Sequence, residues 1–254
     1  MVHFVGAGPG AADLITLRGA RLLQEADVVI YAGSLVNPAL LEYCRPDCET
    51  HDSAAMTLEE VLERIEQAEW AGKTTVRLHT GDPALYGAIR EQMDALETRG
   101  IPFDLTPGVS SFSAAAAALH AEYTLPGVSQ SLILTRAEGR TPVPEREGLS
   151  SLAAHGASMA LFLSAGLLEK VQRELLAGGY APETPAALVY KASWPEEKTV
   201  RCTVGTLCEA GKNAGINRTA LILIGDFLAP DYERSRLYDP AFETGYRKAR
   251  EEKP

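Results

Sequence analysis

Short apolar runs alternate with longer segments in the first half of the chain, and the two differ in their spacing. In the longer segments, apolar residues recur every three or four positions, as on one face of a helix. The short runs have the length of buried strands. Because strands joined by helices form parallel sheets, this half predicts a parallel α/β sheet. Its four strands are expected within residues 2–10, 28–31, 74–78 and 101–106.

The second half also contains apolar runs, together with one segment that alternates between polar and apolar residues. That segment, residues 198–203, is expected to be an antiparallel partner of its neighbours, which makes the second sheet mixed. The other strands are expected at residues 131–135, 158–164, 186–191 and 219–225. We predict an N-terminal α/β domain (1–120), a C-terminal α/β domain (121–230) and a charged tail (231–254) that is a partly ordered helix or frayed.

The segment from Arg77 to Gly87 follows a predicted strand and contains residues typical of a helix start. Asp82 is a favoured N-cap, and Pro83 suits the first helical position because its missing N–H would have no partner there. Gly81 allows a sharp turn or the close approach of another molecule, and the free amides at a helix start can hold a polar ligand. On spacing alone, a plain helix start is the favoured interpretation.

A glycine-rich turn, residues 6–10, follows the first strand and is similar to the opening of a dinucleotide-binding unit. Its third glycine comes one position early for G-x-G-x-x-G, and Pro9 removes an amide that would hold a pyrophosphate. The next strand ends in Ala32-Gly33, without the acidic residue expected for a ribose hydroxyl. A nicotinamide-dependent oxidoreductase is therefore kept as an alternative only. The turn still lies where open α/β sheets bind ligands.

Composition and charge narrow the class of protein. The chain has 254 residues, of which 46% are hydrophobic, enough to build two cores. Its formal net charge of −10 argues against nucleic acid or an anionic membrane as a partner, because both attract basic surfaces. No apolar run approaches the roughly 20 residues of a membrane span, and Met1 leads directly into a strand-like segment, so a soluble, cytoplasmic protein is expected.

Few patterns in the sequence indicate nucleophilic or metal-dependent catalysis. The chain has no G-x-S-x-G elbow, H-E-x-x-H helix or P-loop lysine. Its four cysteines lack the spacing of paired zinc ligands, so we expect reduced thiols and no metal site.

Thr57 and Glu60 have the form of a capping box. Residues 51–53 are expected in a solvated loop, with a substrate-facing loop as the alternative, and residues 136–148 are expected in a mobile loop over a cleft.

Five segments, in this order along the chain, resemble motifs of the S-adenosylmethionine-dependent tetrapyrrole methylases of cobalamin biosynthesis. They are residues 6–10, 31–35, 79–87, 107–112 and 217–220. The likeness extends from residue 2 to about residue 228. It implies two α/β domains with the active site in the cleft between them, a cofactor folded against both domains, and a homodimer.

The resemblance also assigns residues to the cofactor S-adenosylmethionine, which is released as S-adenosylhomocysteine. Asp82 would accept a hydrogen bond from a ribose hydroxyl or from the cofactor's ammonium group, in addition to capping a helix. Ser110 and Ser111 would face the ligand or cap the helix that follows, and both interpretations stay open. Matched position by position, the cofactor residues are Pro9, Thr80, Gly81, Asp82, Leu85, Ser110, Ser111, Ser164, Ala192, Thr219 and Ala220.

The implied substrate is a reduced tetrapyrrole, a flat macrocycle that carries several carboxylates. A sulfonium methyl is already activated, so transfer to an electron-rich carbon needs alignment and exclusion of water, and orientation alone contributes roughly 7–11 kcal/mol. His79 and Tyr86 flank the central loop and are weak candidates for a proton acceptor. Basic side chains suit the carboxylates, and the candidates are Arg136, Arg140, Lys191 and Arg218. The alternatives are methylation at another ring position, the nicotinamide oxidoreductase, and a tetrapyrrole carrier that transfers no methyl.

Overall fold

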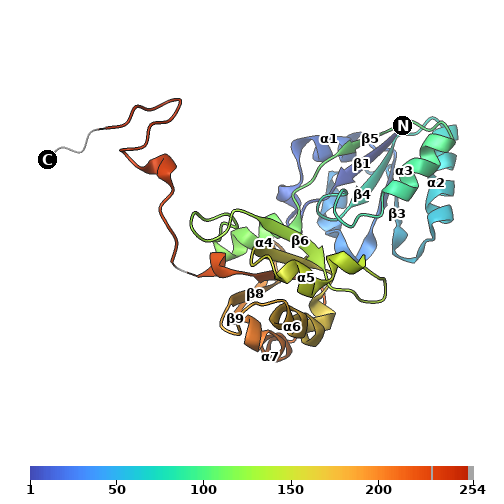
Figure 1. Ribbon diagram of the computed structural model, residues 1–254. Helices are drawn as coiled ribbons and strands as arrows, with labels where there is room; N and C mark the ends of the chain where they lie inside the picture. Colours follow the sequence, from blue (N-terminus) through green and yellow to red (C-terminus); the bar gives the residue numbers. More distant parts are fainter. Residues whose placement is uncertain (230, 251–254) are drawn as a thin grey trace. The chain divides into compact units, whose positions relative to one another are not determined.

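The computed structural model describes residues 1–229 and 231–250. The chain divides into two compact units, each built of strands and helices (Figure 1). The first unit contains residues 1–115, and the second begins at residue 116. The segment Lys191–Glu197, which lies between two strands of the second unit in the sequence, belongs to the first.

The first unit is built on a five-stranded sheet with the order β3-β2-β4-β1-β5, in which every described pair of neighbours is parallel. The predicted parallel sheet is therefore confirmed. Its strands are β1 (Val2–Gly6), β2 (Val28–Tyr31), β3 (Glu49–Asp52), β4 (Thr75–His79) and β5 (Phe103–Thr106). The expected loop at residues 51–53 is wrong in part, because 51 and 52 end the edge strand β3. A strand of sequence Glu-Thr-His-Asp has no apolar run by which it could be recognised.

Helices cover both faces of this sheet (Figure 1). One face packs Phe4 and Ile30 against α2 (Leu58–Trp70) and α3 (Arg90–Thr98). The other face packs Leu78 against α1 (Leu17–Glu25), whose N-cap is Thr16. The predicted capping box at residues 57–60 is confirmed at the start of α2. Burial on both faces explains why a central strand such as β2 is a continuous apolar run.

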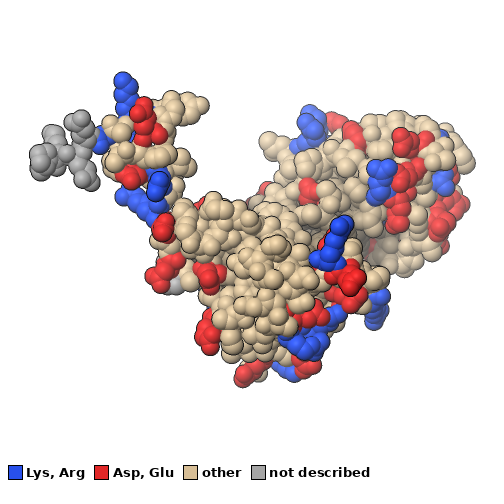
Figure 2. Space-filling view, viewed as in Figure 1, with Lys and Arg blue, Asp and Glu red and all other residues tan. Residues whose placement is uncertain are grey.

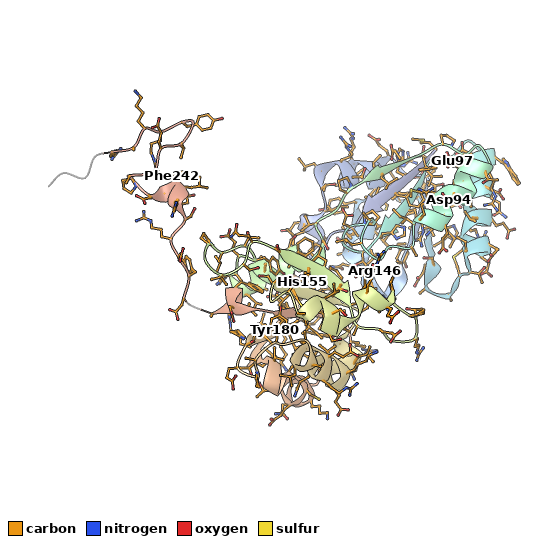
Figure 3. The ribbon with its side chains drawn as sticks, viewed as in Figure 1. Asp94, Glu97, Arg146, His155, Tyr180 and Phe242 are labelled. Atoms are coloured by element: carbon orange, nitrogen blue, oxygen red, sulfur yellow. The ribbon has the colours of Figure 1, made fainter. Side chains whose placement is uncertain are left out.

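The outer surface of α2 and α3 carries charges of both signs (Figure 2). Arg90 forms an ion pair with Asp94 at 2.7 Å, and Arg99 pairs with Glu66 at 2.8 Å. Asp94 and Glu97 point away from the sheet (Figure 3), whereas Leu96 on the same helix is fully buried. The helical period of the sequence thus separates a core face from a solvated face.

The start of α3 differs from the sequence prediction. A helix was expected from Pro83 with Asp82 as its N-cap, but residues 83–86 form turns and α3 begins at Arg90. Tyr86 and Ala88 have φ values of 57° and 48°, which lie in the left-handed region and interrupt a right-handed helix. No local sequence signal marks these positions, because neither residue is glycine, asparagine or aspartate.

The second unit contains a mixed five-stranded sheet with the order β6-β7-β10-β8-β9. Strands β6 and β7 are parallel, and the remaining neighbours are antiparallel, so the predicted mixed sheet and the antiparallel segment at 198–203 are confirmed. The strands are β6 (Leu132–Arg136), β7 (Ser158–Phe162), β8 (Pro185–Tyr190), β9 (Lys198–Thr203) and β10 (Ala220–Ile224). The helices are α4 (Ser111–Leu119), which leads into this unit, α5 (Leu149–Ala153), α6 (Leu168–Ala177) and α7 (Leu207–Ala214).

The core of the second unit lies between its sheet and helices α5, α6 and α7. Met159 and Leu188 from the sheet pack with Val171, Leu175 and Leu207 from the helices, and all five are fully buried. Figure 3 shows Tyr180 in this unit, where its hydroxyl donates a hydrogen bond to the carbonyl of residue 157.

The described part of the tail, residues 231–250, forms one short helical turn, Arg236–Tyr238. The guanidinium of Arg247 donates to the carbonyls of Leu237 and Asp239 at 3.0 and 2.6 Å and so folds the chain back on itself. Across residues 1–229 and 231–250, no helix combines the length and the apolar character needed to cross a membrane.

Candidate functional site

The carboxyl ends of β1, β4 and β5 meet through glycines. We call Gly6, Gly8, Gly81 and Gly108 the glycine edge. A Cβ on Gly108 would lie 2.1 Å from the carbonyl oxygen of Gly81, and one on Gly6 would lie 2.5 Å from the Cα of Gly108. Gly81 donates to the carbonyl of Gly8 at 2.8 Å, and Gly8 donates in return at 3.3 Å. Glycine is required here because the loops approach one another closer than any side chain would permit.

Asp82 fastens the glycine edge by hydrogen bonds to two backbone amides. Its Oδ1 accepts from the amide of Ala84 at 2.8 Å, and its Oδ2 accepts from the amide of Gly108 at 3.0 Å. The carboxylate therefore joins the loop after β4 to the loop after β5. Each of its oxygens retains acceptor capacity, so Asp82 can also receive a hydrogen bond from a ligand.

The structure brings most of the cofactor residues predicted in the first unit to this edge. Ser110 is 7% exposed, and its Cα would lie 3.7 Å from a Cβ on Gly81. Its carbonyl accepts from the amides of Ser113 and Ala114, so it directly precedes α4. Thr80, Leu85 and Ser111 are half-buried in the same loops, whereas Pro9 is buried beside Gly8.

The segment Lys191–Glu197 closes over the glycine-rich turn. The indole Nε1 of Trp194 donates to the carbonyl of Pro9 at 3.0 Å, and the hydroxyl of Ser193 accepts from the amide of Ala11 at 3.0 Å. A Cβ on Gly10 would lie 2.0 Å from Cδ1 of Trp194. The ring fills the space beside Gly10, so any residue larger than glycine would clash with it there.

Two predicted site residues belong to the same segment. Ala192 is buried, with 6% of its surface exposed. The ammonium of Lys191 lies 3.3 Å from a carboxylate oxygen of Glu196 and 5.0 Å from the ring centroid of Trp194. The charge of Lys191 is thus already compensated within the segment, and its role toward a substrate carboxylate stays a prediction.

The other predicted residues belong to the second unit. Ser164 is fully buried, and its hydroxyl donates to the carbonyl of Phe162 at 2.7 Å and accepts from the amide of Ala137 at 2.8 Å. This hydroxyl joins the ends of β6 and β7 and retains one acceptor lone pair, and its contact with the cofactor stays a prediction. Thr219, with a φ of 50°, precedes β10 and is exposed, and Ala220 is half-buried.

The basic candidates of the second unit differ in how they are held. The guanidinium of Arg136 donates to the carbonyls of Thr141 and Pro142 at 3.2 and 2.7 Å and so curls the loop that follows β6. Arg140 and Arg218 are exposed. Their assignment to substrate carboxylates stays a prediction.

His79 and Tyr86 both line a pocket of about 270 Å³ in the first unit. His79 is only 4% exposed, and burial together with the nearby charge of Arg77 lowers its pKa to about 3. A neutral ring with so low a pKa is a weak proton acceptor at neutral pH. Tyr86 is 46% exposed. Proton acceptance by either residue stays a prediction, and the pKa of His79 favours a hydrogen-bonding role.

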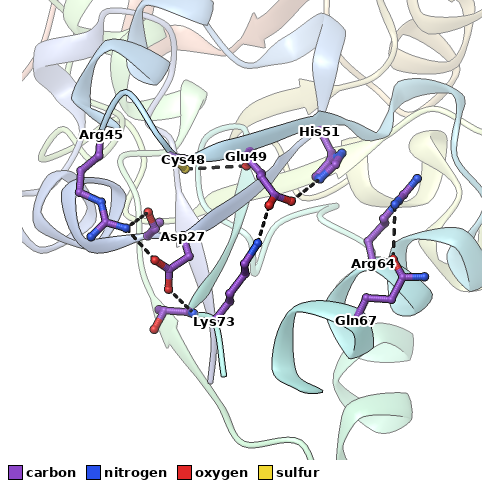
Figure 4. A network of polar contacts seen from close by, with 10 residues as sticks. Asp27, Arg45, Cys48, Glu49, His51, Arg64, Gln67 and Lys73 are labelled. Carbon is purple, nitrogen blue, oxygen red and sulfur yellow. Dashed lines mark hydrogen bonds and ion pairs between the residues drawn. The ribbon is translucent and has the colours of Figure 1, made fainter. Parts of the chain in front are cut away.

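A polar network at the opposite, amino-terminal edge of the same sheet has a structural role (Figure 4). Asp27 accepts from Arg45 at 2.6 Å and from the amide of Thr74 at 2.8 Å, which lowers the pKa of the Asp27 carboxyl. Lys73 pairs with Glu49 at the start of β3. These contacts fix the beginnings of β2, β3 and β4. Ligands of parallel sheets bind at the carboxyl ends of the strands, so this network lies at the end of the sheet opposite to the expected ligand site.

Sequence reasoning passed over one polar residue of this unit. Arg77 lies within β4, is 6% exposed and lines the same pocket as His79. The available signal was a charged residue inside an otherwise apolar strand, because such a side chain is rarely buried without a reason.

A glycine edge with one carboxylate, small hydroxyls and backbone amides has donors and acceptors that suit a polar small molecule. Comparison with known proteins identifies the family of the chain. Residues 1–208 match the family of Tetrapyrrole (Corrin/Porphyrin) Methylases. The chain belongs to this family, and the prediction of the family is confirmed.

Several relatives are similar over almost their whole length. A cobalt-precorrin-4 C(11)-methyltransferase of Methanocaldococcus jannaschii is 53% identical over 249 residues, covering 98% of this chain and 96% of the relative. A precorrin-4 C(11)-methyltransferase of Mycobacterium tuberculosis is 46% identical and covers 94% of this chain and 96% of the relative.

Solved structures agree with this assignment. The X-ray structure of a cobalt-precorrin-4 methyltransferase has a TM-score of 0.88 at 50% identity, covering 90% of this chain and 96% of that one. A uroporphyrin-III C-methyltransferase from Thermus thermophilus, in complex with S-adenosylhomocysteine, has a TM-score of 0.76 at 28% identity and covers 89% of this chain and 98% of that one. The predicted fold class, an α/β protein with one parallel and one mixed sheet, is thereby confirmed.

Proposed function

We propose that the protein transfers a methyl group from S-adenosylmethionine to carbon 11 of precorrin-4 or cobalt-precorrin-4, giving the corresponding precorrin-5 and S-adenosylhomocysteine. The observation that carries this proposal is the 53% identity, over 98% of the chain, to a relative named for that reaction. Relatives named for precorrin-4 and for cobalt-precorrin-4 are both similar over most of the chain, so we propose both forms of the substrate.

The donor set at the glycine edge fits S-adenosylmethionine. When bound, this cofactor supplies a methyl group already activated on a sulfonium. Backbone groups, small hydroxyls and the Asp82 carboxylate suit ribose hydroxyls and an ammonium group. In the first unit we propose Pro9, Thr80, Gly81, Asp82, Leu85, Ser110, Ser111 and Ala192 as cofactor residues, and in the second Ser164, Thr219 and Ala220.

Positioning is the main contribution that we propose for the protein. The short loops of the glycine edge are joined to one another by backbone hydrogen bonds and by Asp82, so they provide a preorganised surface. We further propose Arg136, Lys191 and Arg218 as partners of substrate carboxylates.

The homodimer and the cytoplasmic location also stay proposals. Sedimentation of the purified chain tests the homodimer.

The experiment that tests the proposal is incubation with methyl-labelled S-adenosylmethionine and each precorrin intermediate in turn, followed by mass spectrometry and NMR of the product. We expect the mass of one methyl group to be gained on precorrin-4 and on its cobalt form, and on no other intermediate, with the label on carbon 11. Label on another carbon would assign a different ring position. Binding of the macrocycle without a gain in mass would instead indicate a carrier. Calorimetric binding of NAD in place of S-adenosylmethionine would restore the oxidoreductase alternative.

A further inference from the structure

The pocket that contains His79 is lined by residues of the first unit alone and has an apolar wall and a polar end. Its volume is about 270 Å³, which suits a small substituent and is less than whole drug-sized ligands require. Leu35, Met56 and Val61 belong to its apolar wall, whereas Arg77 and His79 from β4 and Glu91 from α3 supply polar groups. Because Arg77 and His79 are two positions apart in one strand, their side chains lie on the same face of the sheet.

Arg77 is a buried cation held by neutral groups. Its Nε donates to Oε1 of Gln92 at 3.1 Å, and its Nη1 donates to the carbonyl of Ile30 at 3.1 Å. None of the ion pairs found in residues 1–229 and 231–250 includes Arg77. Burial lowers the pKa of Arg77 to about 10. A buried guanidinium without an anion is costly, so this site would be stabilised by a carboxylate.

His79 supplies a second polar group whose hydrogen-bonding capacity is unused. Its Nε2 is buried and has no hydrogen-bond partner in the described part of the chain. Its ring stacks on Phe4 with a centroid distance of 6.0 Å, which fixes its position. Most buried polar atoms are paired, so an unpaired nitrogen that lines a pocket points to a ligand.

The loop beside this pocket is held in a strained conformation. Tyr86 and Ala88, which both line the pocket, have positive φ angles, and a Cβ on Gly87 between them would lie 2.2 Å from the carbonyl oxygen of Pro83. Backbone strain of this kind is concentrated at ligand sites.

We propose that this pocket receives one carboxylate-bearing side chain, an acetate or a propionate, of the tetrapyrrole substrate. The carboxylate pairs with the guanidinium of Arg77 and accepts a hydrogen bond from Nε2–H of His79, while the methylene groups contact the apolar wall. This inference rests on the proposed function, because it takes the substrate to be a tetrapyrrole with several such side chains. It assigns substrate binding to two residues that would otherwise be part of the core.

Substitutions separate the charge from the packing. Arg77→Met keeps the length of the side chain without its charge, Arg77→Lys keeps the charge, and His79→Phe keeps the aromatic stack on Phe4. Arg99→Met is the matched control, because it removes one cation from the far end of α3 in the same unit. We expect the KM for precorrin-4 to rise at least tenfold in Arg77→Met and threefold or more in His79→Phe. The calorimetric affinity for S-adenosylhomocysteine should stay within twofold in every folded variant.

A second measurement uses the unaltered chain and so does not depend on the folding of a variant. With 15N-labelled histidine, the chain gives five side-chain signal sets, and His79→Phe identifies that of residue 79. Metal-free precorrin-4, added without oxygen to the chain saturated with S-adenosylhomocysteine, should shift the Nε2 signal of His79. Arg77→Met should abolish this shift, and Arg99→Met should keep it.

Three results would overturn the inference: an unshifted His79 signal with precorrin-4, a shift with millimolar sodium propionate but none with precorrin-4, or an unchanged KM in folded Arg77→Met. The second result would assign the pocket to a free carboxylate. Normal methyl transfer by Arg77→Met would refute carboxylate binding in this pocket and leave the proposed function intact. Conversely, if the unaltered chain transfers no methyl but the His79 signal still shifts, the proposed function fails and the carboxylate pocket stands.

Discussion

At the residue scale, the carboxylate of Asp82 shows how one side chain can serve both the fold and a ligand. It was predicted as the cap of a helix, but it instead accepts hydrogen bonds from the amides of Ala84 and Gly108 in two different loops. The sequence could indicate an acidic residue at a strand end. It could not indicate a partner 26 positions away, because that contact depends on the order of the strands.

Asp82→Ala should weaken both the glycine edge and the binding of the cofactor. Two charge-assisted hydrogen bonds disappear, so we expect the free energy of unfolding to fall by about 1–3 kcal/mol. We expect the Kd for S-adenosylhomocysteine, measured by calorimetry, to rise at least tenfold. Asp94→Ala, on the solvated face of α3, is the control and should change neither quantity appreciably. An unchanged Kd in folded Asp82→Ala would remove Asp82 from the cofactor site.

The buried His79 should make the stability of the chain depend on pH. Its pKa is about 3 in the folded chain, against about 6.5 when unfolded, so between these values the unfolded chain binds the extra proton. The stabilising contribution is therefore complete above pH 6.5 and is lost as the pH falls. Between pH 7 and pH 5, we expect the free energy of unfolding of the unaltered chain to fall by about 2 kcal/mol more than that of His79→Phe. Urea denaturation at both pH values checks this, and parallel losses would contradict it.

At the scale of the elements, burial explains what the sequence could predict. The strand expected at residues 28–31 is β2, which is a buried apolar run. The strand expected at 198–203 is β9, in which polar and apolar residues alternate. The polar edge strand β3 lacked such a pattern and was missed. The late start of α3 was also missed, because the left-handed conformations of Tyr86 and Ala88 are imposed by the surrounding structure and not by their own propensities.

Ala88→Gly should relieve part of the strain before α3. Alanine at a φ of 48° is unfavourable, whereas glycine adopts this conformation readily, so we expect the free energy of unfolding to rise by about 0.5–1 kcal/mol. Ala84→Gly is the matched control in the same loop. The φ angle of Ala84 is not among the positive values. The substitution Ala84→Gly should therefore destabilise the chain by a similar amount, because glycine raises the entropy of the unfolded state. Equal effects of the two substitutions in urea denaturation would show that Ala88 is not strained.

At the scale of the whole molecule, the candidate site depends on contacts between segments that are far apart in the sequence. Trp194 covers the turn at Pro9 although the two are 185 positions apart. The five motifs predicted the family, the fold class and the general chemistry. The carboxylate pocket was not predicted, because the roles of Arg77 and His79 depend on helices α2 and α3 closing over β4.

The central claim is that this chain methylates carbon 11 of precorrin-4 by positioning a preactivated donor. The most direct measurement is 13C NMR of the product formed from precorrin-4 and S-adenosylmethionine labelled with 13C in its methyl group. We expect a single new methyl resonance, assigned to the substituent on carbon 11, together with one equivalent of S-adenosylhomocysteine. A label on any other ring carbon, or no label on the macrocycle, would contradict it.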